Sequence, residues 1–267
     1  MKHLVVNADD FGFTTDVNAG ILRAHLEGIV SSASLMANGS AFEDAAGIAE
    51  RHASLGVGCH LTLVQGESLA CPGKPLAPTI ARLLAAPPSA NEIRNEFRAQ
   101  VEALLARGIR PTHLDTHKHI HVFPPVLDAV ASVADEYGIA WIRKPFDIPR
   151  GMPRGARAGL ASVLRPFRIP FEDRLRRARC RTSDYFAGFV TTGSLEARWL
   201  ASLLASLPCG VGEFMCHPGI CGPSLSRAAT RLKESREMEL DALCSPVVRR
   251  TVEEHGIRLV SYGQLPG

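Results

Sequence analysis

The stretch His113-Leu-Asp-Thr-His-Lys-His-Ile-His121 places an ionisable side chain at every odd position for nine residues. In extended backbone such positions share one face. Nine residues exceed the usual length of a strand. We therefore predict a strand over 112–117 and a loop at its carboxyl end that carries His119 and His121. Imidazoles and a carboxylate gathered at a strand end indicate metal binding or acid–base chemistry, rather than a solubilising edge strand.

Composition excludes several classes of protein. The 267 residues fit one domain spanning 1–267, and 46% hydrophobic with 21% charged residues is typical of a soluble globular protein. A formal charge of +3 predicts no general affinity for nucleic acid. Seven scattered cysteines without a CxxC pair argue against disulfides and a zinc knuckle, and favour a cytoplasmic protein. No apolar run has transmembrane length.

An arginine-rich series over 165–181 is the main charged feature of the second half. Such a series is usually a solvated face. The alternative is a patch that meets phosphate or a lipid surface, so a peripheral contact with a membrane stays open. The sequence does not decide between these readings.

Strand and helix patterns alternate along the chain, which predicts parallel strands joined by crossover helices. We expect an α/β fold, an irregular (β/α) TIM-like barrel, with an open doubly wound sheet as the runner-up. Surface excursions are expected at about 66–88 and 146–187. The predicted strands are 3–8, 31–36, 55–63, 112–117, 139–143, 189–192, 210–217 and 257–262, and the main helices are 15–27, 41–51, 92–106, 124–137, 195–207, 225–243 and 246–255.

Polar side chains recur where the predicted strands end. A barrel gathers the carboxyl ends of its strands into one bowl, where ligands bind. An open sheet would spread them along an edge. The residues concerned are Asp9, Asp10, His60, His117, Arg143 and His217.

Asp10, His60 and His117 form a mixed set of one oxygen and two nitrogen ligands for one divalent metal, either Mg²⁺ or Zn²⁺. Three protein ligands leave room for water, whose pKa a metal lowers towards about 7. Asp9, beside the ligand Asp10, is the candidate general base. An aspartate pair alone would more often cap a turn; two strand-end histidines favour the metal site.

The other candidate site residues lie outside the predicted metal set and the aspartate pair. His217 is a candidate general acid, oriented by Glu213 or merely sharing its face, although a histidine in an apolar strand is more often a core residue. Arg143 would hold Asp9 ionised, bind substrate, or form an ordinary salt bridge. His119 and His121 are candidate substrate contacts or extra ligands, and Glu213 is also a candidate substrate-binding residue.

Four motifs resemble the YdjC-like carbohydrate deacetylases (the ChbG family): Asn7-Ala-Asp-Asp-Phe-Gly12, Gly58-Cys-His-Leu-Thr-Leu63, the 113–121 stretch, and Glu213-Phe-Met-Cys-His-Pro-Gly219. The resemblance implies an irregular barrel, one divalent metal and removal of an acetyl group from an N-acetylated amino sugar. It also implies the roles given above for Asp9, Asp10, His60, His117 and His217.

One further segment bears on the substrate. The segment Arg179-Cys-Arg-Thr-Ser-Asp184 is similar to the hopanoid-biosynthesis-associated (HpnK-type) branch, which implies an N-acetylglucosaminyl lipid rather than a chitooligosaccharide. The alternatives are a metal-dependent phosphoesterase and a non-catalytic sugar-binding regulator. The oligomeric state is open, a homodimer being one option.

Overall fold

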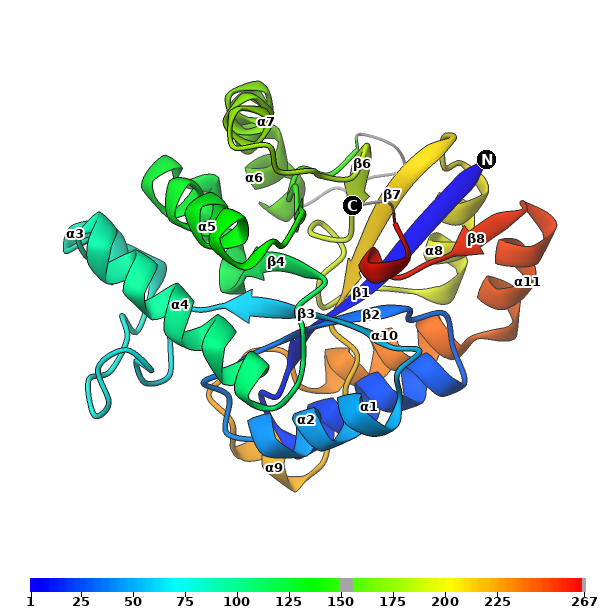
Figure 1. Cartoon of the computed structure of the whole chain (residues 1–267). Helices are drawn as coiled ribbons and strands as arrows, with labels where there is room; N and C mark the ends of the chain where they lie inside the picture. Colours follow the sequence, from blue (N-terminus) through cyan, green and yellow to red (C-terminus); the bar gives the residue numbers. More distant parts are fainter. Residues whose placement is uncertain (149–155, 266–267) are drawn as a thin grey trace.

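The computed structural model of the chain describes residues 1–148 and 156–265. A sheet of parallel strands occupies the centre, and the helices lie outside it (Figure 1). Within the described part the strands are β1 (Lys2–Phe11), β2 (Ser32–Leu35), β3 (Gly56–Leu61), β4 (His113–Thr116), β5 (Trp141–Ile142), β6 (Tyr185–Ala187), β7 (Gly210–Cys216) and β8 (Ile257–Leu259).

The helices bury their apolar sides against this sheet. In α5, prolines occupy the first turn, where a missing N–H costs no hydrogen bond, and Gly138 ends the helix in a left-handed conformation. The α-helices are α1 (Thr15–Leu26), α2 (Phe42–Arg51), α3 (Ile80–Ala85), α4 (Ala90–Ala106), α5 (Pro124–Tyr137), α6 (Ala156–Leu164), α7 (Arg168–Arg177), α8 (Ala197–Ala205), α9 (Pro223–Arg227), α10 (Glu234–Cys244) and α11 (Pro246–Glu254), and the 3₁₀ segments are η1 (His117–Val122), η2 (Arg165–Phe167) and η3 (Tyr262–Gln264).

The strand order is β5-β4-β3-β2-β1-β7-β6, with β8 paired to β1 off this path. In the part of the chain that the structure describes, the two edges of the sheet meet through two isolated bridges, Trp141 to Arg181 and Asp147 to Phe186. The parallel α/β class is therefore confirmed. Over residues 1–148 and 156–265, however, the sheet is a curled half-barrel rather than a complete TIM barrel, because β5 and β6, with two and three residues, are too short to pair continuously.

Two predicted elements are wrong. Residues 189–192 form a turn rather than a strand, and the strand lies at β6. Gly188, with φ of 123°, ends β6 so close to β7 that a Cβ would lie 2.1 Å from the Met215 carbonyl oxygen. The helix expected over 225–243 is broken into α9 and α10, with irregular backbone between them.

The expected excursions contain more regular structure than their composition indicates. Residues 66–88 include α3, and 146–187 include α6, α7 and β6, which belongs to the sheet. Helix α7 is anchored by two buried residues, Phe171 and Leu175. The Phe171 ring packs edge-on against Phe146, with centroids 5.3 Å apart.

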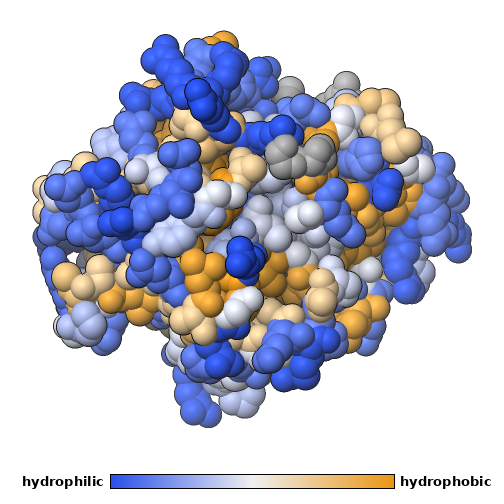
Figure 2. All heavy atoms as spheres, in the orientation of Figure 1, coloured by the Kyte–Doolittle hydropathy of each residue, from blue (hydrophilic) through white to orange (hydrophobic). Residues whose placement is uncertain are grey.

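Hydrophilic side chains cover much of the outer helices on the face shown in Figure 2, and apolar ones gather mainly in the recesses between elements. Among the described residues, no helix combines the length and apolar character needed to cross a membrane.

Candidate metal centre and active site

Asp9 and Asp10 lie near the carboxyl end of β1, where a bulge interrupts its pairing with β2. Consecutive residues of a regular strand point to opposite faces. Asp10 instead adopts φ of 65°, a left-handed conformation that aspartate tolerates better than most residues. Both carboxylates therefore line the same cavity. This local irregularity lets two adjacent acids serve one site.

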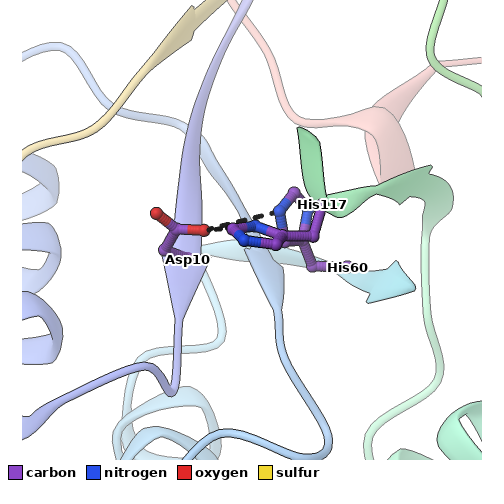
Figure 3. Close-up of side chains that lie close together, drawn as sticks. All are labelled: Asp10, His60 and His117. Carbon is purple, nitrogen blue, oxygen red and sulfur yellow. Dashed lines mark ion pairs between the residues drawn. The ribbon is translucent and has the colours of Figure 1, made fainter. Parts of the chain in front are cut away.

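Asp10, His60 and His117 converge on one point from β1, β3 and the start of η1 (Figure 3). Asp10 Oδ1 lies 3.1 Å from His117 Nδ1 and 3.5 Å from His60 Nε2. The oxygen is buried and accepts no hydrogen bond of normal geometry. The three predicted ligand residues are thus brought together.

The opposite ring nitrogens of both histidines face oxygen acceptors. His60 Nδ1 lies 2.8 Å from Asp115 Oδ1, and His117 Nε2 lies 3.2 Å from Gln65 Oε1. A neutral imidazole that donates to these oxygens directs the lone pair of its other nitrogen at Asp10. Such outer contacts are characteristic of metal-binding histidines. The donor set therefore fits a cation held between the three side chains.

A fully buried guanidinium, Arg143, ties together three carboxylates near this site. Its Nη1 and Nη2 each donate to Asp9 at 2.6 Å, and Nη1 also lies 2.5 Å from Asp115. Its Nε donates to Glu213 at 2.7 Å. Asp9, His60 and Asp115 also cluster closely enough to share an ion. Because Arg143 already pairs with both carboxylates, we favour the cluster around Asp10.

A second buried arginine, Arg236 on α10, was not predicted. Its Nη2 lies 2.5 Å from Asp10 Oδ2, the carboxylate oxygen turned away from the histidines. This contact leaves Oδ1 to face them. Arg236 and Glu239 share the buried side of α10 with Leu240 and Leu243. Charged residues at helical spacing within an apolar stripe are the sequence signal that could have revealed them.

The charges of this connected group favour a divalent cation. Four carboxylates, those of Asp9, Asp10, Asp115 and Glu213, contact two guanidiniums, and all are buried. With neutral histidines this leaves a formal charge of −2. Uncompensated buried charge is costly. One divalent ion would balance it.

The pKa shifts agree with this view of the site. Burial raises the pKa of Asp10, but Arg236 and the two histidines more than offset it and hold that pKa well below its usual range. Burial lowers the pKa of His60, but Asp115 and Asp10 raise it by a larger amount, so that the pKa is about 10. The surroundings of His60 therefore attract positive charge, which a bound cation can supply.

A cavity of about 1040 Å³ opens over the site. His119 and His217 line it, and each has a buried Nδ1 without a hydrogen-bond partner. Burial lowers the pKa of the His217 imidazole, and the charge of Glu239 opposes this shift. Both histidines are thus available to polar groups of a bound molecule.

Glu213 and His217 have different hydrogen-bond partners. Glu213 accepts from Arg143 and, at 2.6 Å, from the Tyr262 hydroxyl. Glu239 instead accepts from the His217 backbone N–H at 2.6 Å. Of the two alternatives for Glu213, these contacts favour the one in which it only shares a strand face with His217, because its carboxylate pairs with Arg143.

Three residues proposed as substrate contacts, His121, Arg143 and Glu213, have no exposed surface and do not line the cavity. His121 Nε2 faces the Arg143 carbonyl oxygen at 3.0 Å, and its Nδ1 faces Thr116 Oγ1 at 2.6 Å. This geometry supports a positioning role for all three. His119 is the candidate substrate contact that reaches the cavity.

Asp115→Asn is expected to lower the affinity for a divalent metal by about 10–100-fold, because it removes one buried negative charge and weakens the contact that orients His60. Isothermal titration with Zn²⁺ or Mn²⁺ measures the effect. Asp241→Asn, an exposed change on α10, is the matched control. Equal affinities for both variants would show that Asp115 does not support the site.

The fold and cavity define an α/β protein with an enzyme-like site at the carboxyl ends of its strands. A model of the family described as YdjC-like protein matches residues 3–254. The chain belongs to this family. It is 30% identical to a carbohydrate deacetylase of Brevibacillus brevis, covering 98% of this chain and 99% of that protein.

Two further proteins match this chain over nearly its whole length. A chitooligosaccharide deacetylase of Serratia marcescens is 29% identical, with 99% of both chains covered. A solved structure from Enterococcus faecalis, described as a candidate cellobiose-phosphate cleavage protein, has a TM-score of 0.81 at 25% identity and covers 100% of this chain and 99% of its own. The expected membership of a family of hydrolases is confirmed. The hopanoid-associated branch is not confirmed.

Proposed function

We propose that this chain is a metal-dependent carbohydrate N-deacetylase that hydrolyses the acetamide of an N-acetylglucosamine-containing substrate to a free amine and acetate. The observation that carries the proposal is the convergence of Asp10, His60 and His117 beside Asp9 in one cavity. The deacetylase names of the relatives support the same chemistry. All four side chains belong to the motifs that first indicated the family.

A divalent ion held by Asp10, His60 and His117 would supply Lewis-acid activation of the acetyl carbonyl and a more acidic water. Asp9, oriented by both Nη atoms of Arg143, accepts the proton of the attacking water. As the C–N bond breaks, His217 donates a proton to the departing amine. His119 contacts the sugar through its unpartnered Nδ1.

Part of the cavity lining is apolar, which favours a substrate with an apolar portion. This part includes Val122, Phe123, Leu160, Leu164 and Phe189, beside polar residues such as Gln65, Lys118 and Arg231. A free oligosaccharide can cover such a surface only with the C–H faces of its sugar rings, whereas a lipid tail would bury more apolar area there. We therefore favour an N-acetylglucosaminyl lipid over a chitooligosaccharide as the natural substrate.

The test is an acetate-release screen over chitooligosaccharides, N-acetylglucosamine and N-acetylglucosaminyl lipids, with a phosphoester series in parallel. We expect acetate release that stops with a chelator and returns with added divalent metal, and fastest turnover of the lipid. Release of phosphate instead would favour the phosphoesterase. Binding without any product would favour a sugar-binding regulator.

A further inference from the structure

The strongest surface feature outside the site is the segment 156–181, which we name the basic arm; it contains α6, η2 and α7. It contains eight arginines and two acids, a formal charge of +6, although the whole chain carries only +3. The rest of the chain is therefore net negative. Positive charge is concentrated on this one arm.

Exposed apolar side chains lie among these arginines. Leu160, Val163, Phe167 and Ile169 are 48%, 66%, 56% and 64% exposed. Ten large apolar residues are exposed in the described part of the chain, and these four fall within ten consecutive positions. Scattered exposed apolar residues need no explanation, but a cluster of them marks an interaction surface.

Several arginines of the arm are free to meet a partner. Arg174 pairs with Asp128, and Arg176 pairs with Asp173. In the described structure Arg165, Arg177 and Arg179 are exposed and form no ion pair. Unpaired arginines beside exposed apolar side chains are the pattern of segments that lie on anionic lipid surfaces.

The arm also forms part of the cavity wall. Arg157, Leu160 and Leu164 of α6 line the same cavity as the site residues. Leu160 thus belongs both to the cavity and to the exposed apolar cluster. A surface that met the arm would lie next to the cavity opening.

We propose that the basic arm docks this protein on the surface of an anionic lipid bilayer, with Phe167 and Ile169 entering the headgroup region and Arg165, Arg177 and Arg179 binding lipid phosphates. Docking places the cavity beside the bilayer. A lipid-linked sugar could then enter it without leaving the membrane completely; this consequence, unlike docking itself, depends on the proposed function.

Co-sedimentation with vesicles tests docking without any substrate, so its outcome is independent of deacetylase activity. The full chain is expected to bind vesicles that contain phosphatidylglycerol, to bind pure phosphatidylcholine weakly, and to dissociate as salt increases. The triple change Arg165→Glu, Arg177→Glu, Arg179→Glu should weaken binding at least about tenfold. The control Arg249→Glu, Arg250→Glu alters exposed arginines of α11 and should bind as the unchanged protein does.

The apolar contribution is tested in the same assay. Phe167→Ser with Ile169→Ser should also weaken vesicle binding, whereas Leu26→Ser with Met238→Ser removes exposed apolar surface elsewhere and should not. Equal binding to both lipid compositions, equal loss in arm and control variants, or no vesicle binding would overturn the proposal. Binding to heparin without binding to vesicles would also overturn it, because the arm would then be a general polyanion site.

Discussion

Asp9→Asn is expected to reduce acetate release by about 10²–10⁴-fold even when the metal site is saturated, because the amide cannot accept the proton of the attacking water. Asp9 does not belong to the proposed ligand set of Asp10, His60 and His117. Arg143 keeps its contacts with Asp115 and Glu213 in the variant, so the buried guanidinium remains compensated.

The measurement is turnover at saturating metal together with the metal content per chain. Asp135→Asn changes an exposed carboxylate of α5 and serves as the control. Unchanged turnover in Asp9→Asn would remove Asp9 from the role of base. Loss of metal along with activity would place Asp9 among the ligands instead.

His117→Ala is expected to abolish both metal binding and activity, with turnover lower by at least about 100-fold at ambient metal, because one of three ligands is lost. The fold should survive. The His117 side chain is 15% exposed, and in the described structure its ring has polar contacts with Gln65 and with Asp10.

Metal analysis and thermal unfolding of the same sample separate the two effects. His255→Ala, an exposed histidine after α11, is the matched control. A folded His117→Ala protein that still binds one metal per chain would contradict the ligand set. A protein that fails to fold would instead assign His117 a structural role, which its partial exposure argues against.

The centre of the site could be predicted because its signals are local. The Asp9-Asp10 pair and the histidines at 60 and 117 each lie where an apolar strand pattern stops, and the parallel fold brings strand ends together. The order of strands and helices along the chain was sufficient to predict that these residues lie together. The exact register of the strands was not needed.

The supporting residues could not be predicted in this way. Arg236 lies 226 positions from its partner Asp10, and which acid it pairs with depends on how α10 packs against the sheet. Glu213 lies on β7 at an even spacing from His217, which follows the strand, yet the Glu213 carboxylate pairs with Arg143, the residue after β5. Which buried charged residues pair with each other depends on the tertiary structure, and local sequence does not determine it.

The incomplete barrel has a similar cause. Hydrophobic pattern predicted strands over 139–143 and 189–192, but strand closure depends on continuous pairing between neighbours. Among the described residues, the pairing between the two edges of the sheet consists of the isolated bridges at Trp141 and Asp147. The positive φ of Gly188, invisible in an apolar pattern, turns the chain before 189.

We expect one divalent ion to bind between Asp10, His60 and His117. Anomalous diffraction from crystals grown with Zn²⁺ or Mn²⁺ tests it most directly. The expected result is one strong peak within about 2.0–2.2 Å of Asp10 Oδ1, His60 Nε2 and His117 Nδ1. A peak held by Asp9 and Asp115, or no peak at these side chains, would contradict it.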